Sequence, residues 1–136
     1  MRFPARTRLK KSAEFERVRH AGRKVEYGPF AMQIASDAVP AQQKPVRRLG
    51  VVASKRVGGA VQRNRAKRLL RAVFRSNQDM LPAHCDVVLL ARPSLPTLTI
   101  REVEPVYQQA LAKFAKYRAT QASREAAPVV VTTVSN

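Results

Sequence analysis

Several residue types are scarce in this chain of 136 residues, and each shortage excludes a class of protein. Cys85 is the only cysteine, so no intrachain disulfide can form, which fits a reducing cytoplasm. Tryptophan is absent and aromatic residues make up 6% of the chain, so the stacking platform of an RNA-recognition sheet is poorly supported. No apolar run is long enough to span a membrane, and no apolar stretch of a secretory signal follows the basic N-terminus.

Acidic residues are also few. The chain contains 9 Asp and Glu against 26 Lys and Arg, for a formal net charge of +17, and no acid occurs between Asp37 and Asp79. Such an excess favours a polyanionic partner, with nucleic acid ahead of a membrane. An anionic membrane is disfavoured because small and branched apolar residues, suited to a protein core, accompany the basic segment.

The remaining acids and histidines do not match a catalytic or metal-binding pattern. Glu102 and Glu104 are two residues apart, so they would point to different faces of a helix. His84 and Cys85 supply two adjacent ligands where a zinc site needs about four, and His20 is remote in the sequence. We therefore expect a binding protein with no catalytic residue and no metal or cofactor site of its own.

The stretch from Lys55 to Arg75 contains eight Lys or Arg residues and no acid. Its first part, to Gln62, is predicted to be a loop, in which Gly58-Gly59 marks a turn that side chains would obstruct. From about Gln62 to a point between Ser76 and Asp79 the spacing predicts a helix. One row of i, i+4 steps on this helix is cationic and comprises Arg63, Lys67, Arg71 and Arg75, with Asn64 and Arg68 extending the same face. The opposite arc is apolar and comprises Ala66, Leu69, Leu70, Val73 and Phe74, whereas Arg65 lies near the boundary.

Stacked like charges repel by a few tenths of a kcal/mol per pair, roughly, so a helix that needed only solubility would include acids. A polyanion turns that repulsion into attraction, which favours nucleic acid over a solvated surface helix. Lys55, Arg56 and the backbone N–H groups around Gly58-Gly59 can bind phosphates beside the helix N-terminus. Asn64 adds an amide that can pair with a base or sugar edge.

The rest of the chain predicts an α+β domain over residues 1–119, with helices packed on one small sheet. Residues 1–11 are expected to form a basic arm, extended and mobile when free, and residues 120–136 a disordered tail. Phe15 is equally suited to core packing and to stacking on RNA. The predicted elements are a helix over Ala13–Ala21 capped by Ser12, strands over Tyr27–Ala35 (interrupted by Gly28-Pro29), Arg47–Ser54 and Asp86–Ala91, and a last helix. That helix either begins at a Thr99–Glu102 capping box and is kinked at Pro105, or begins near Glu104.

The segment Gln62 to Arg71, QRNRAKRLLR, resembles the protein subunit of bacterial ribonuclease P, whose hallmark is an Arg-Asn-Arg helix. The similarity extends from about Arg8 to Phe114 and includes the blocks RLKKSAEF, RLGVVASKRVGGAVQRNRAKRLLRAVFR and DVVLLARP. The resemblance implies a small α/β sandwich with a mostly antiparallel sheet and a left-handed βαβ crossover, similar to a domain of certain ribosomal proteins. Physical rules alone would favour a right-handed crossover.

The resemblance also implies a function and partners. A member of this family is the protein cofactor of a ribozyme in the cytoplasm: the RNA subunit, with bound Mg²⁺, cleaves precursor tRNA to produce the mature 5′ end. The protein, a monomer when free, binds that RNA and the 5′ leader of the substrate. No membrane is involved.

Site residues follow from the resemblance by position. Facing the catalytic RNA we expect Arg63, Asn64, Arg65 and Arg68, with Lys55 and Arg56 in a loop near RNA. Facing the leader we expect Lys67, Arg71 and the cleft aromatic Phe15. Arg19 and Gln33 occupy cleft positions where some relatives carry aromatic residues, so leader recognition here is expected to depend on charge and hydrogen bonds.

Two other functions are consistent with the same residues. One is a non-enzymatic ribosome-associated or general RNA-binding protein of the same fold. The other is a DNA-binding protein, which would need a recognition helix with base-reading side chains. The helix here is too uniformly cationic to favour sequence readout.

Overall fold

The computed structural model describes residues 8–9, 12–21, 23–35 and 44–126. Its helices and strands are α1 (Ser12–Ala21), β1 (Arg23–Tyr27), β2 (Phe30–Ala35), β3 (Arg47–Val52), α2 (Ala60–Ser76), β4 (Cys85–Ala91) and α3 (Ile100–Ala126). Three short 3-10 helices join them, η2 (Lys55–Val57), η3 (Gln78–Met80) and η4 (Leu95–Thr97). The strands form one sheet in the order β1-β2-β4-β3. The predicted α+β class is confirmed.

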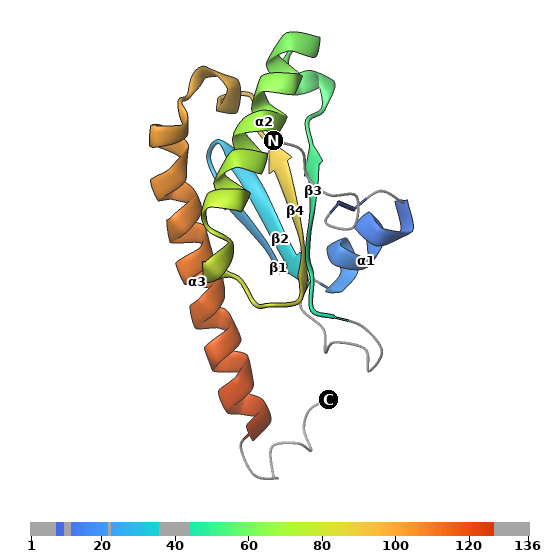
Figure 1. The fold of residues 1–136 in the computed structure, drawn as a ribbon, viewed down its shortest axis with the longest axis vertical. Helices are drawn as coiled ribbons and strands as arrows, with labels where there is room; N and C mark the ends of the chain where they lie inside the picture. Colours follow the sequence, from blue (N-terminus) through green and yellow to red (C-terminus); the bar gives the residue numbers. More distant parts are fainter. Residues whose placement is uncertain (1–7, 10–11, 22, 36–43, 127–136) are drawn as a thin grey trace.

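The sheet is antiparallel except at one edge, where β3 pairs with β4 in parallel. Helix α2 connects these two parallel strands. In Figure 1 both strands point upward, α2 lies in front of the sheet and β4 lies to the left of β3, so the connection is left-handed. This is the hand that the resemblance implied, against the general preference for right-handed crossovers.

Helices cover both faces of the sheet, with α2 and α3 on one side and α1 on the other (Figure 1). The larger core lies under α2 and α3, where Phe30, Met32 and Ile34 of β2 are 0–3% exposed. The smaller core lies under α1 and contains Val18 and Ala35. Strand β2 is therefore buried on both faces, which the alternating pattern of its sequence did not indicate.

The predicted strand over Tyr27–Ala35 is wrong in extent. Gly28-Pro29 forms the turn of a β1–β2 hairpin, with Gly28 at a φ of 54°. The left-handed backbone region suits glycine because it has no Cβ. Strand β1 was missed because its sequence, RKVEY, is polar, as is common in an edge strand.

The last helix begins as in the first of the two predicted alternatives and extends further than predicted at its end. It begins at Ile100 after a capping box in which the Thr99 N–H donates to Glu102 Oε1 over 2.9 Å. Pro105 lies within the helix, where its missing N–H removes one bond, to the carbonyl of Arg101. The helix continues to Ala126, so 120–126 is helical although the sequence predicted disorder over 120–136; residues 127–136 lie outside the described part.

Two segments near the N-terminus join the sheet through polar contacts. The Leu9 N–H donates to the Leu49 carbonyl over 3.0 Å, so this part of the expected mobile arm pairs with the β3 edge. Residues 1–7 and 10–11 lie outside the described residues.

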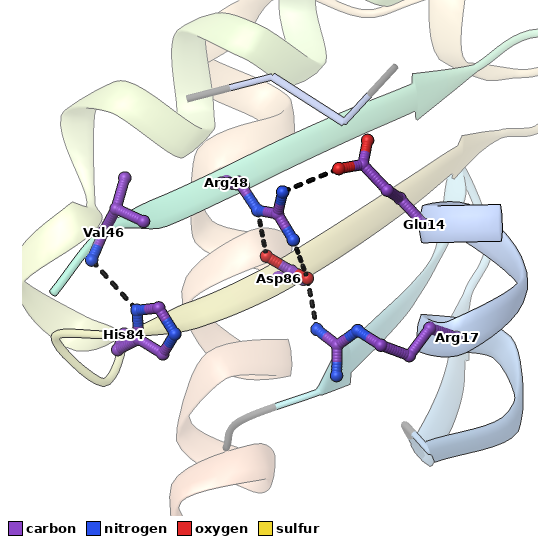
Figure 2. A network of polar contacts seen from close by, with 6 residues as sticks. All are labelled: Glu14, Arg17, Val46, Arg48, His84 and Asp86. Carbon is purple, nitrogen blue, oxygen red and sulfur yellow. Dashed lines mark hydrogen bonds and ion pairs between the residues drawn. The ribbon is translucent and has the colours of Figure 1, made fainter. Parts of the chain in front are cut away.

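Helix α1 is attached to the sheet by ion pairs. Arg48 of β3 donates to Asp86 of β4 and to Glu14 of α1, each at 2.8 Å, and Arg17 of α1 donates to Asp86 (Figure 2).

Acid should weaken this attachment. Burial alone would raise the pKa of Asp86, but hydrogen bonds from Arg48 and Arg17 outweigh burial and hold the pKa below the usual 3.8. A lowered folded-state pKa means that the carboxylate stabilises the fold at neutral pH and that this stability is lost as pH falls through the folded pKa. We expect Asp86→Asn to reduce the free energy of unfolding by roughly 2 kcal/mol at pH 7, and by less at pH 3. Urea denaturation at both pH values measures this; a pH-independent difference would contradict it.

Candidate RNA interface

Helix α2 buries one face and presents the other as a cationic surface. Ala66, Leu70 and Val73 are 0% exposed and Phe74 is 1% exposed. Of the predicted apolar arc only Leu69 is half-buried, at the margin of the core. The polar face is formed by Arg63, Asn64, Lys67, Arg68, Arg71 and Arg75, all exposed or half-buried. The predicted burial of the apolar arc is confirmed for four of its five residues, whereas Arg65, placed at the boundary, is exposed and the row of Arg63, Lys67, Arg71 and Arg75 is half-buried.

The basic loop before α2 folds as η2, anchored by the buried Val57. Lys55 and Arg56 are exposed, and the Arg56 N–H donates to Ser54 Oγ over 3.3 Å. Gly58 has a φ of 140°, and a Cβ there would lie 2.9 Å from the Cβ of Gln62. The predicted turn thus requires glycine at position 58 on both conformational and steric grounds, whereas Gly59 has a φ of −76° and no close contact that a side chain would meet.

The N-terminus of α2 favours an anion. Gly59, at the cap position, has no side chain to satisfy the first N–H groups, and the first turn contains no acid. Unsatisfied N–H groups and the helix dipole attract negative charge, and Lys55 and Arg56 lie in the adjacent η2. This end of α2 has the features that suit contact with a phosphate backbone.

Arg65 differs from the other cations because its guanidinium is held by backbone carbonyls. It donates from Nε to the Pro96 carbonyl over 2.7 Å and from Nη2 to the Leu98 carbonyl over 3.1 Å. These bonds fasten the η4 segment to α2 and fix the guanidinium. Because an arginine has five N–H donors, others remain for a phosphate.

An open hollow of about 500 Å³ runs along this side of α2. It is lined by Val61, Asn64, Arg65, Arg68, Leu69 and Ala72. Three of the residues expected to face catalytic RNA, namely Asn64, Arg65 and Arg68, therefore share one surface, whereas Arg63 is not among the lining residues.

A second, smaller hollow lies at the β3 edge on the α1 side. Its volume is about 90 Å³, and its lining comprises Arg8, Leu9, Phe15, Leu49, Gly50, Val51 and Arg71. Phe15 and Arg71, which are far apart in sequence and belong to different helices, meet here. Burial lowers the pKa of Arg71, and the nearby charge of Arg8 lowers it further. The charges of Arg71 and Arg8 repel each other, and a phosphate bound between them would reduce that repulsion.

The other three residues expected in the leader cleft do not line this hollow. Lys67 is half-buried one turn before Arg71 on α2. Arg19 is exposed and donates to Glu16 over 2.7 Å. Gln33, 7% exposed, lies opposite Val88 in the sheet register, on the face that α1 covers.

Two contributors to the hollow were not identified from the sequence. Arg8 was assigned to a mobile arm, although Leu9 beside it is an apolar residue suited to pairing and burial. Gly50 was not singled out within its strand. A Cβ at Gly50 would lie 2.4 Å from Cε1 and 2.7 Å from Cζ of Phe15, so the ring rests directly on the β3 backbone. Phe15 is half-buried by this contact, which combines the packing and exposed roles that the sequence left open.

We expect Gly50→Ala to displace the Phe15 ring and to destabilise the protein by about 1–3 kcal/mol, as overpacking does. In the Phe15→Ala background the ring is gone and only the Leu9 Cβ, 3.2 Å away, crowds the added methyl group, so the same change should have a smaller effect. Urea denaturation of the parent, the two single variants and the double variant gives the coupling free energy between Phe15 and Gly50. Equal effects of Gly50→Ala in both backgrounds would show that the ring does not occupy this place.

The histidine and glutamate residues considered as metal ligands or catalytic groups make structural contacts where their side chains are described. His84 Nδ1 accepts from the Val46 N–H over 3.1 Å, so this half-buried histidine fixes the chain just before β3 (Figure 2). The His20 side chain lies outside the described part. Glu102 caps α3, and Glu104 accepts from Asn77 over 3.1 Å.

Among described residues, no three His, Cys, Asp or Glu side chains are grouped so as to hold a metal ion. In the same described part of the chain, no helix is both long enough and apolar enough to cross a bilayer.

Comparison with known proteins agrees with this geometry. The family model described as Ribonuclease P matches residues 3–115. The chain belongs to the ribonuclease P protein family. The ribonuclease P protein component of Desulforapulum autotrophicum is 37% identical over 101 residues, which cover 74% of this chain and 82% of that protein. The Bacillus pumilus protein component is 35% identical over 113 residues, covering 83% and 92% respectively.

The fold of this ribonuclease P family member also matches solved structures. The Staphylococcus aureus RNase P protein superposes with a TM-score of 0.64 at 27% identity, covering 81% of this chain and 95% of that one. The family match ends at residue 115, so the last part of α3 lies beyond the matched region.

Proposed function

We propose that this chain is the protein component of ribonuclease P and that it binds two RNAs. One is the catalytic RNA of the enzyme, and the other is the 5′ leader of precursor tRNA. The observation that carries the proposal is the placement of the polar side chains of α2: Asn64, Arg65 and Arg68 line one surface, while Arg71 lines another with Phe15. A single helix can therefore lie between two RNA segments.

The surface of Asn64, Arg65 and Arg68 is the candidate contact for catalytic RNA. Guanidinium groups bind phosphate oxygens in bidentate fashion, and the fixed Arg65 loses little side-chain freedom on binding. Asn64, which is exposed, can pair with a base or sugar edge. Lys55, Arg56 and the first N–H groups of α2 would extend this contact along the backbone.

The hollow of Phe15, Gly50 and Arg71 is the candidate contact for the leader. A single-stranded leader offers unstacked bases and phosphates, which suit an aromatic ring and a guanidinium side by side. Arg19 is proposed to act at the margin of this cleft, with Lys67 and Arg71 on the α2 side, whereas Gln33 is buried on the sheet face beneath α1. The contact is mainly electrostatic, so affinity should fall steeply as salt is raised.

In this proposal the protein positions RNA and shields its charge, while the RNA subunit performs the cleavage with its own Mg²⁺. Shielding reduces repulsion between two polyanions, so less Mg²⁺ is needed to hold them together.

Reconstitution tests the proposal. The purified chain, mixed with ribonuclease P RNA at a Mg²⁺ concentration too low for the RNA alone, should restore cleavage of precursor tRNA at the mature 5′ end. Each component alone should be inactive under those conditions. A chain that binds the RNA without stimulating cleavage would instead support a general RNA-binding protein of this fold.

A further inference from the structure

The ring of Phe15 can serve the cleft only if α1 is held in one orientation on the sheet. Among the described side chains of α1, Val18 and Phe15 supply the apolar packing on the small core beneath the helix. Val18 is fully buried beneath α1, whereas neighbouring Glu14 and Phe15 are half-buried and Arg17 and Arg19 are exposed. A helix of 10 residues is marginal in isolation, so its position depends on the contacts made with the sheet.

The ion-pair network supplies a further restraint. Arg48 and Asp86 are register partners on β3 and β4, and Asp86 is 4% exposed. Through them the sheet binds α1 at Glu14 and at Arg17, which lie on either side of Phe15 in sequence (Figure 2). Rotation or sliding of α1 would break both attachments.

The network also lies beside the ring that it would position. Arg48 and Gly50 are two residues apart on β3, so their side-chain positions share the face covered by α1. Gly50 receives the Phe15 ring, and Arg71 completes the hollow. The carboxylate of Asp86, which accepts from both Arg48 and Arg17, is the shared centre of the network.

We propose that Asp86 is a positioning residue for leader binding: through Arg48 and Arg17 it holds α1 so that Phe15 lies on Gly50 beside Arg71. This inference rests on the proposed leader contact of the hollow. Asp86 itself is buried and would not touch RNA.

The test uses holoenzyme reconstituted from the full chain and catalytic RNA, and compares the dissociation constants of precursor tRNA and mature tRNA. The dissociation constant of mature tRNA divided by that of precursor tRNA is the ratio that measures the leader's contribution. We expect Asp86→Asn to lower the ratio about fivefold or more, and Arg17→Gln to lower it less. Glu26→Gln is the matched control, because Glu26 also pairs with two cations, Lys24 and Arg92, but lies on the far edge strand β1. It makes the same charge change and should leave the ratio within about twofold.

A second comparison separates positioning from general loss of structure. In the Phe15→Ala background the ring is absent, so Asp86→Asn should have no further effect on the ratio. An equal effect with and without the ring, or an unchanged ratio in both Asp86→Asn and Arg17→Gln, would overturn the inference. If Asp86→Asn prevents folding, Arg17→Gln alone decides, since the Arg17 side chain is 41% exposed and its replacement leaves Asp86 paired with Arg48. A parent protein that shows no preference for the leader would instead refute the proposed leader contact itself.

Discussion

Replacing Arg68 with Ala is expected to raise the protein concentration for half-maximal holoenzyme assembly by about tenfold or more. Arg68 is exposed and lines the α2 hollow with Asn64 and Arg65. A hydrogen bond to a charged group contributes roughly 1.5–3 kcal/mol, and 1.4 kcal/mol is a factor of ten in affinity. The measurement is a filter-binding titration of catalytic RNA with the protein at fixed salt.

The control for Arg68→Ala removes the same charge from another surface. Lys113 of α3 lies with its Nζ 5.7 Å from the Tyr27 ring centroid, at the β1 edge. Lys113→Ala should change the midpoint by no more than about twofold, because only the general electrostatic attraction is reduced. Equal midpoints for Arg68→Ala and the parent, or equal losses for both variants, would contradict a specific contact on α2.

Arg65 provides a further comparison within the same experiment. Arg65→Lys keeps the charge but cannot reproduce the bonds from one planar group to the Pro96 and Leu98 carbonyls. We expect it to weaken assembly nearly as much as Arg65→Ala, because the fixed guanidinium is lost in both. Full assembly by Arg65→Lys would show that charge alone suffices there.

Arg71→Ala is expected to weaken binding of leader-bearing precursor tRNA to the holoenzyme by about tenfold, while affinity for mature tRNA changes little. The physical reason is the location of Arg71 in the hollow with Phe15 and Arg8, which mature tRNA would not enter. Arg75→Ala is the matched control: it removes the same charge one turn further along α2 and should affect both ligands alike. Equal losses for both ligands in Arg71→Ala would rule out a leader contact at this residue.

The basic helix could be predicted from sequence because its information is local. Cations at i, i+4 spacing and an opposite apolar arc define the buried face without knowledge of the rest of the fold, and Leu70 and Val73 are buried as expected. The capping box of α3 was also visible, although sequence alone could not decide whether Pro105 would be tolerated.

The features missed from sequence depend on contacts between distant segments. Gly50 lies in a strand where glycine has no local reason to occur, and its role appears only when Phe15 of α1 is placed over it. Asp86 opens an apolar run, and its cationic partners Arg17 and Arg48 are 69 and 38 residues away. The meeting of Phe15 and Arg71 likewise depends on helices of different faces reaching one sheet edge.

The central claim is that the Asn64–Arg68 side of α2, and not the opposite edge of the domain, lies on the catalytic RNA. Affinity cleavage tests it directly: Cys85 is replaced by Ala, a cysteine is placed at Asn64 or at Lys113, and each is loaded with an iron chelate that cuts nearby RNA. We expect strong, localised cleavage of the catalytic RNA from position 64 and little from position 113. Equal cleavage from both positions, or cleavage mainly from 113, would contradict it.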